Sequence, residues 1–183
     1  MPAAKEREPL FTNRTTVERR SQRELVITRV IDGPARLVFE VWTKPDLLKR
    51  WWAPCSLGVI LVKCEADVRL GGQYRYVFSG PAEPMAFSGT YLEVTPYSRL
   101  VYSQIFEPAR DAGEAIITIT FDERRGKTFL LLRELYPSKE ALDVAIAAGM
   151  EHGLRETLDQ LEQLVVIATS GPFDGQVSSG GRG

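Results

Sequence analysis

The sequence predicts an α+β domain in which a curved antiparallel sheet of about seven strands wraps around a long C-terminal helix. Three observations lead to this fold class. A β-branched run over residues 24–31 is followed by two short helical segments. Six strand-like runs then follow one another, with turn residues between them. Residues 138–168 carry apolar side chains at helical spacing, and the preceding sheet gives this apolar stripe a surface to cover.

The composition is that of one ordinary globular domain. The 183 residues are 44% hydrophobic and 26% charged, and 23 Lys and Arg against 24 Asp and Glu leave a net charge of −1. This balance provides no global field for a polyanion, so neither nucleic acid nor an anionic membrane is an expected partner. The chain has no apolar leader and no run near the roughly 20 residues of a membrane span, so we expect a cytoplasmic protein.

Both ends of the chain differ in composition from the middle. Residues 1–23 are dense in Arg, Glu and Thr without apolar periodicity, and residues 169–183 are rich in Gly and Ser. Such segments cannot bury enough apolar surface to fold by themselves. We therefore expect a flexible N-terminal extension over 1–23, a folded domain over 24–168 and a disordered tail over 169–183.

The first strand is expected at ELVITRVI, because β-branched and apolar residues dominate it. Pro34 then fits the first turn of a short helix in DGPARLVFEVWT. Pro45 starts a second short helix, and Pro54 ends it because proline cannot continue the hydrogen-bonded ladder.

Two adjacent tryptophans in TKPDLLKRWWAP cannot face the same way on a helix. Helical spacing groups Trp51 with Leu47 and Leu48, so we expect Trp51 to be the buried anchor between the short helices and the sheet. Trp52 is expected beside the loop at the entrance of the space under the sheet.

Six further strands are expected from Gly58 onward, in GVILVKCEADV, GQYRYVFSG, MAFSGTYLEV, RLVYSQIF, AIITITFDE and KTFLLLREL. Short segments rich in Gly, Pro and Ser join most of them, which is typical of an antiparallel meander.

The last segment, SKEALDVAIAAGMEHGLRETLDQLEQLVVIA, is expected to form one long amphipathic helix. Ser138 is a suitable N-cap for it. Gly149 and Gly153 each cost about 1 kcal/mol relative to alanine inside a helix, and the close approach of a strand or a ligand would explain the pair.

Five segments, in this order and spacing, resemble the START-like (SRPBCC) helix-grip superfamily, which includes the birch-pollen-allergen proteins and polyketide cyclases. They are TRVIDGPARLVFEVWTKPDLLKRWWAP, CEADVRLGGQYRYVF, FSGTYLEVTPYSRLVYS, TITFDERRGKTFLLL and GMEHGLRETLDQLEQLV, and they extend over residues 28–165. They are most similar to the branch that resembles the C-terminal domain of the activator of heat-shock protein 90 ATPase. The resemblance implies a helix-grip fold with an apolar cavity between the helix and the sheet. Residues 1–23 are too short to supply the separate N-terminal domain with which eukaryotic activators contact the chaperone.

The cavity lining is predicted from the faces of the strands. Period-2 alternation puts Tyr74, Tyr76 and Phe78 on one face, which we expect to be the concave one. Large apolar walls with a few polar groups are typical of ligand pockets, whereas ordinary core packing is the alternative for each residue. The candidate lining residues are Trp42, Trp52, Tyr74, Tyr76, Phe78, Phe87, Tyr91, Tyr102, Ile117, Ile119, Phe129, Leu131, Met150, Gly153 and Leu154.

Polar groups in such a cavity would recognise a ligand. A buried phenol needs a hydrogen-bond partner, which a ligand or water can supply. Glu93 is a polar cavity group if its face, shared with Phe87 and Tyr91, is the concave one. If Leu92 and Val94 point inward instead, Glu93 is solvated, and alternation does not decide between the two faces.

No catalytic constellation, metal site or cofactor is predicted. The one histidine, His152, is expected at the surface, and Cys55 and Cys64 form neither a zinc motif nor a disulfide framework. A Ser/His/Asp or Cys/His nucleophilic site would therefore have no histidine to act as its base. The sequence also contains no glycine-rich phosphate-binding motif. Acid–base work would fall to Glu93, Glu134, Arg69 or a tyrosine.

Three functions are weighed on this basis. The leading hypothesis is a domain that binds a hydrophobic, lipid-like or aromatic small molecule without clear catalytic machinery. The alternatives are a cyclase, aromatase or hydratase that uses the same cavity, and a chaperone-interacting module related to heat-shock protein 90 ATPase activators. The identity of the ligand, any reaction and the oligomeric state, monomer or homodimer, stay open.

Overall fold

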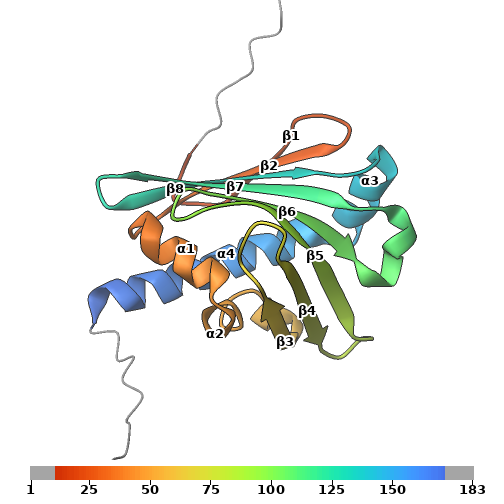
Figure 1. The fold of residues 1–183 in the computed structure, drawn as a ribbon, viewed down its shortest axis with the longest axis horizontal. Helices are drawn as coiled ribbons and strands as arrows, with labels where there is room; N and C mark the ends of the chain where they lie inside the picture. Colours follow the sequence, from red (N-terminus) through yellow and green to blue (C-terminus); the bar gives the residue numbers. More distant parts are fainter. Residues whose placement is uncertain (1–10, 172–183) are drawn as a thin grey trace, which may run out of the picture.

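An eight-stranded antiparallel sheet curves around helix α4 (Met150–Ser170) in the computed structural model, which describes residues 11–171 (Figure 1). The order of strands across the sheet is β1-β2-β8-β7-β6-β5-β4-β3. Their bounds are β1 Thr16–Arg19, β2 Glu24–Ile31, β3 Ile60–Ala66, β4 Gln73–Ser79, β5 Met85–Thr95, β6 Arg99–Phe106, β7 Ala115–Arg124 and β8 Lys127–Leu135. Strands β3 to β8 form the predicted meander, and β2 closes it by pairing with β8.

Seven of these strands were predicted, and the eighth comes from the segment expected to be an extension. Thr16–Arg19 forms β1 and pairs with β2 from Thr16↔Thr28 to Arg19↔Leu25. A strand of four residues has too little apolar periodicity to be recognised by itself, and it exists here because β2 offers a free edge. Residues 1–10 and 172–183 lie outside the described part of the chain.

Short helices fill the crossover between β2 and β3 and flank the end of the sheet. These elements are α1 (Ala35–Thr43), α2 (Pro45–Leu48), the 3-10 helices η1 (Cys55–Leu57) and η2 (Glu107–Ala112), and α3 (Lys139–Ala147). Ser138 caps α3 as predicted, since its Oγ accepts a hydrogen bond of 3.0 Å from the Ala141 N–H. Helix α4 then extends as far as Ser170, into the expected tail.

The prediction of one long C-terminal helix is wrong at a single residue. Gly149 has φ +83°, a left-handed conformation that ends α3 and starts α4. Glycine reaches this region without the steric cost that a Cβ imposes, which explains the glycine better than close packing does. Gly153 lies within α4, where an added Cβ would meet only Pro54 at 3.5 Å.

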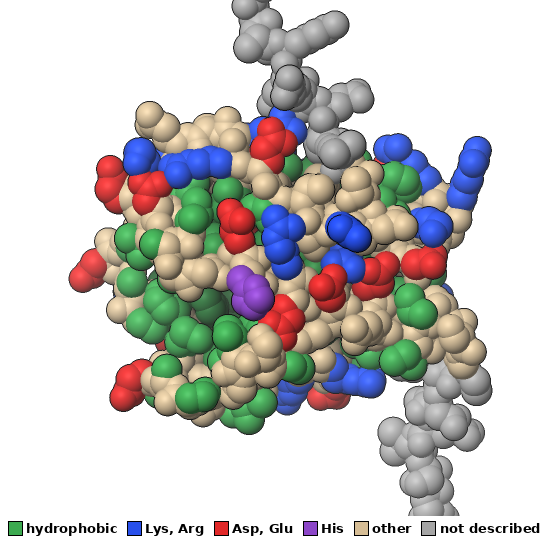
Figure 2. Space-filling model, turned by 180° about the vertical axis from the view of Figure 1, so that it is seen from behind, with side chains coloured by type: hydrophobic (Ala, Val, Ile, Leu, Met, Phe, Trp, Pro, Cys, Tyr) green, Lys and Arg blue, Asp and Glu red, His purple; other side chains and the backbone are tan. Residues whose placement is uncertain are grey.

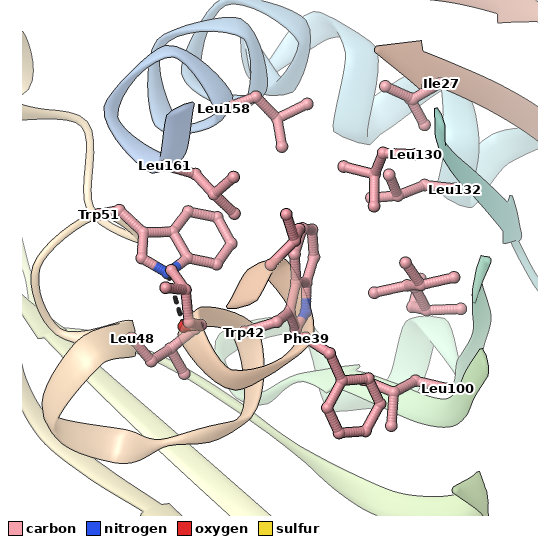
Figure 3. Close-up of a cluster of buried hydrophobic side chains, with 14 of the residues drawn as sticks. Ile27, Phe39, Trp42, Leu48, Trp51, Leu100, Leu130, Leu132, Leu158 and Leu161 are labelled. Carbon is pink, nitrogen blue, oxygen red and sulfur yellow. Dashed lines mark hydrogen bonds between the residues drawn. The ribbon is translucent and has the colours of Figure 1, made fainter. Parts of the chain in front are cut away.

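The hydrophobic core lies between the inner face of the sheet and helices α1 and α4 (Figure 3). Leu158 and Leu161 of α4 face Leu130 and Leu132 of β8 across this core, and all four are at most 2% exposed. We call this the inner face of the sheet; the opposite face is the outer face. Within the described residues, no helix is long and apolar enough to cross a membrane.

One buried arginine ties α4 to the sheet. Arg29 of β2 is 5% exposed, and its guanidinium forms ion pairs with Asp159 and Glu162 of α4. It also donates a hydrogen bond of 3.0 Å to the Thr15 Oγ1. A buried charge of this kind is tolerated only when its partners are in place, so the arrangement fixes the position of α4 along the sheet.

The two glycines at the start of α4 should respond to alanine with opposite signs. Gly149→Ala forces an L-residue into the left-handed region, and we expect the free energy of unfolding to fall by about 1–2 kcal/mol. Gly153→Ala should raise it by about 0.5–1 kcal/mol, because the position is helical and has room for a methyl group. Urea denaturation followed by circular dichroism measures both changes. Destabilisation by both substitutions would contradict the assigned roles.

Candidate ligand site on the inner face of the sheet

Two neighbouring rows of side chains across the inner face differ in chemistry. The strand registers align Val94, Leu100, Ile119, Leu132 and Ile27 in an aliphatic row. The next row lies two residues along β2, β6, β7 and β8 and three along β5, where a β-bulge intervenes. It contains Tyr91, Tyr102, Ile117, Glu134 and Leu25. Polar atoms therefore enter the interior immediately beside the row that packs the core.

A small enclosed space lies at the tyrosine end of this second row. It is lined by seven side chains and has a volume of about 10 Å³, which is enough for one water molecule. The lining residues are Trp42, Leu48, Trp52, Tyr74, Tyr76, Tyr91 and Tyr102. Six of them are buried, and only Trp52 is half-buried.

The rings around this space contact one another closely. Tyr74 is the central ring, with centroid distances of 4.8 Å to Tyr76, 5.6 Å to Tyr91 and 5.5 Å to Tyr102. Trp52 completes the wall, with its centroid 6.4 Å from that of Tyr76. The offset and edge-on geometries are those that aromatic pairs prefer, so the wall is well packed.

The phenol groups keep their protons at neutral pH. Burial raises the pKa of Tyr74, Tyr76, Tyr91 and Tyr102 above the usual value of 10.0. The Tyr74 hydroxyl donates to the Ser103 carbonyl oxygen at 2.7 Å, whereas the Tyr76 and Tyr91 oxygens lie 3.3 Å apart in a weaker bond. The site thus presents neutral hydroxyl groups in an apolar wall.

Gly89 makes room for the central ring. A Cβ at this position would lie 1.8 Å from the Ser103 carbonyl oxygen and 2.9 Å from Tyr74 Cε1, so no other residue fits. The Tyr74 side chain crosses over this gap to reach Ser103. The sequence analysis did not identify Gly89, although a glycine inside a strand is a recognised sign of close approach.

Helix α4 holds the loop that carries Trp52. The Gln160 Nε2 donates to the carbonyl oxygens of Trp51 and Ala53, both at 2.8 Å, and its Oε1 accepts from the Cys55 N–H at 3.0 Å. Glu156 accepts a hydrogen bond of 2.7 Å from the Ser56 N–H. The wall at Trp52 is therefore fixed by hydrogen bonds to α4 rather than by burial alone.

Among residues 11–171, Glu134 is the one acidic side chain that is buried on the inner face of the sheet. It is 7% exposed, and its Oε2 accepts a hydrogen bond of 3.0 Å from the Tyr136 hydroxyl. Burial raises its pKa to about 6, and the bond from Tyr136 opposes this shift. A carboxyl group that titrates near neutral pH inside the fold is typical of functional sites.

The surface offers two further hollows. Figure 2 shows hydrophobic side chains gathered in a depression beside His152, which is itself exposed as predicted. An open hollow of about 590 Å³ lies over the outer face of β4, β5 and β6. Its lining includes a bidentate ion pair of Arg75 and Glu107, which holds the pKa of Glu107 down at about 2. That hollow is polar and unenclosed, unlike the space behind Trp52.

The structure brings six of the predicted lining residues together around the enclosed space, namely Trp42, Trp52, Tyr74, Tyr76, Tyr91 and Tyr102. Phe78 and Phe87 lie beyond it in an edge-to-face contact with centroids 5.8 Å apart, and Ile117 and Ile119 lie on the inner face next to it. Met150 and Leu154 pack against the core from α4, and Gly153 contacts the Trp52 loop at Pro54.

Three predicted site residues lie elsewhere. Phe129 and Leu131 are on the outer face of β8, where Phe129 meets Phe11 edge to face with centroids 5.4 Å apart; Leu130 and Leu132 point inward instead. Alternation of polar and apolar residues does not indicate which face of a strand is buried when, as in β8, consecutive residues are all apolar. Glu93 is also on the outer side, 3.1 Å from Arg99, because a β-bulge after Tyr91 shifts the register of β5.

Two side chains of the site were missed or left unplaced by the sequence analysis. Leu48 lines the enclosed space, and its helical spacing from Trp52 was the available signal. No pattern in the sequence indicated Gln160, because its contacts with the loop depend on how α4 crosses the sheet. Among residues 11–171, no group of three or more His, Cys, Asp and Glu side chains is placed to hold a metal ion.

An antiparallel sheet wrapped around a long helix, with an aromatic inner face, defines the START-like helix-grip class of proteins. The family described as Activator of Hsp90 ATPase homolog 1-like protein matches residues 32–166, and the chain belongs to this family.

Solved structures are similar over most of the chain. A protein from Rhodobacter sphaeroides is 23% identical with a TM-score of 0.77, over 84% of this chain and 99% of that one. A protein from Chromobacterium violaceum is 27% identical with a TM-score of 0.68, over 79% and 98%. CalU16 from Micromonospora echinospora is 23% identical with a TM-score of 0.54, over 78% and 65%. These likenesses establish the fold, and no curated protein matches the chain.

The adjacent tryptophans should differ in their contribution to stability. Trp51 is 1% exposed and its indole N–H donates to the Val41 carbonyl oxygen at 3.0 Å. We expect Trp51→Ala to lower the free energy of unfolding by about 3–5 kcal/mol, and Trp52→Ala to lower it by less than about 2 kcal/mol. Urea denaturation measures both changes. Equal decreases in the free energy of unfolding would show that both tryptophans are ordinary core residues.

Glu134 should make stability depend on pH. Its folded pKa of about 6 exceeds its usual 4.5, so its contribution to stability is fully present below pH 4.5 and is lost as the pH rises through 6. We expect the stability of the wild type relative to Glu134→Gln to fall by about 2 kcal/mol between about pH 4 and pH 7.5. A difference that stays constant over this pH range would contradict the assigned burial of the charge.

Proposed function

We propose that the chain binds a small, mainly apolar molecule between α4 and the inner face of the sheet, at the tyrosine row. The observation that carries the proposal is the enclosed space, whose wall combines large rings with neutral phenol hydroxyls. An apolar wall with a few placed hydrogen-bonding groups is the common composition of ligand pockets. A cytoplasmic location, expected from the sequence, is part of this proposal.

Binding requires the wall to move, because typical ligand pockets have volumes of about 300–1,000 Å³. Trp52 is the side chain that can do so. It is the only half-buried member of the lining, so its indole can rotate toward solvent while the hydrogen bonds of Gln160 and Glu156 keep its loop on α4. Outward rotation of the Trp52 indole would enlarge the space without disturbing these hydrogen bonds or the aliphatic row of the sheet.

Family membership supports a second candidate, which is contact with a chaperone. The family is described by its likeness to an activator of a chaperone ATPase. Exposed apolar side chains that suit such a contact lie on η1 and on the edge strand β3, where Leu57, Ile60 and Val62 are 52%, 62% and 51% exposed. Pull-down with the purified chaperone and stimulation of its ATPase test this candidate, and the absence of both would exclude it.

A neutral fluorescent probe tests the leading proposal. We expect N-phenyl-1-naphthylamine to bind at one saturable site with a blue-shifted emission, because the rings exclude water from it. Trp52→Ala should change the dissociation constant by about tenfold or more. Leu57→Ala, on the same loop but 52% exposed and outside the lining, should leave it unchanged. No binding, or equal effects of both substitutions, would contradict the proposed site.

A further inference from the structure

We infer, on the basis of the proposed function, that Glu134 anchors a protonated amine carried by an otherwise apolar or aromatic ligand. The carboxyl group lies on the same inner-face row as Tyr91 and Tyr102. Its surroundings define what kind of partner it can accept.

The Glu134 carboxyl group forms one hydrogen bond with the described part of the protein. Its Oε2 accepts one hydrogen bond, from the Tyr136 hydroxyl at 3.0 Å. Within residues 11–171, its Oε1 accepts no hydrogen bond, and no Lys, Arg or His forms an ion pair with the group. The other buried charge of the inner face, Arg29, has two carboxylate partners. Glu134 is thus a buried acid without a counter-charge.

A cation is the partner that such a group favours most. An ionised carboxylate in the protein interior is costly unless an opposite charge or several hydrogen bonds compensate it. The cost of burying the charged form also appears as the raised pKa of about 6. The group is still mostly ionised at pH 7.5. A neutral hydroxyl donor would supply a hydrogen bond without the compensating charge.

The neighbouring groups fit the rest of such a ligand. The titratable groups that face Glu134 are Tyr102 and Tyr136, both neutral. Its row neighbours Leu25 and Ile117 are apolar, and Met150 of α4 contacts the Tyr136 hydroxyl that binds the carboxyl group. The backbones of β6 and β8 at Tyr102 and Glu134 are two strands apart, roughly 10 Å. Aromatic rings also attract a cation through their negative faces.

This geometry suits a ring joined to an amine by a short chain. The ring would take the place beside Tyr102 and the amine would reach Glu134 past Ile117. 4-Phenylbutylamine and 4-phenylbutan-1-ol form a matched pair of probes that differ mainly in charge, since the amine stays protonated at both pH 5 and pH 7.5.

Isothermal titration with both probes tests the inference. For the wild type at pH 7.5, the amine should bind about tenfold or more tightly than the alcohol, because its hydrogen bond to the carboxylate is charge-assisted. Glu134→Gln, which keeps the shape of the side chain, should reduce this preference to within about twofold. Glu93→Gln removes an exposed carboxylate from the outer face and should keep the preference.

The wild type at pH 5 provides a second measurement that does not depend on how a variant folds. Protonation of Glu134 should there shrink the preference for the amine several-fold. Equal binding of both probes by the wild type, or a preference that survives Glu134→Gln, would overturn the inference while the proposed function stands. Failure of both probes to bind would overturn the proposed function as well.

Discussion

Helix α4 packs on the inner face of the sheet, and the ion pairs of Arg29 with Asp159 and Glu162 fix where it lies. Because this position is fixed, α4 can carry the side chains that hold the Trp52 loop, and Gln160 alone makes three hydrogen bonds to it. The enclosed space exists between this loop and the tyrosines of β4, β5 and β6. Displacing α4 would therefore remove both the core and the wall of the site.

The chemistry of the interior changes abruptly beside this core. One row of the sheet is entirely aliphatic, and the next contains two tyrosines and Glu134. Buried phenols and a carboxyl group are less favourable for folding than leucine and isoleucine would be. Their presence in a face that is otherwise well packed is the physical reason to place ligand recognition there rather than in the open polar hollow of the outer face.

Much of this architecture follows from local sequence patterns, and the errors have specific causes. Alternation and turn residues located β2 to β8, and helical spacing identified Trp51 as the buried ring. Periodic patterns did not locate two local features, the β-bulge that turns Glu93 outward and the left-handed conformation of Gly149. Each feature changes the backbone at only one or two positions, whereas a periodic pattern is recognised over a whole segment. The sequence identified Glu134 only as one of several candidate acid–base groups, because its burial depends on which face of β8 meets α4.

The central claim is that an apolar molecule binds between α4 and the tyrosine row. Intermolecular nuclear Overhauser effects between a bound neutral aromatic probe and the protein test it most directly, since they arise only between protons about 5 Å apart or closer. The account predicts contacts from the probe to the rings of Trp52, Tyr76 and Tyr102, which line the enclosed space. Contacts confined to the outer-face hollow at Gln73 and Thr90 would contradict it.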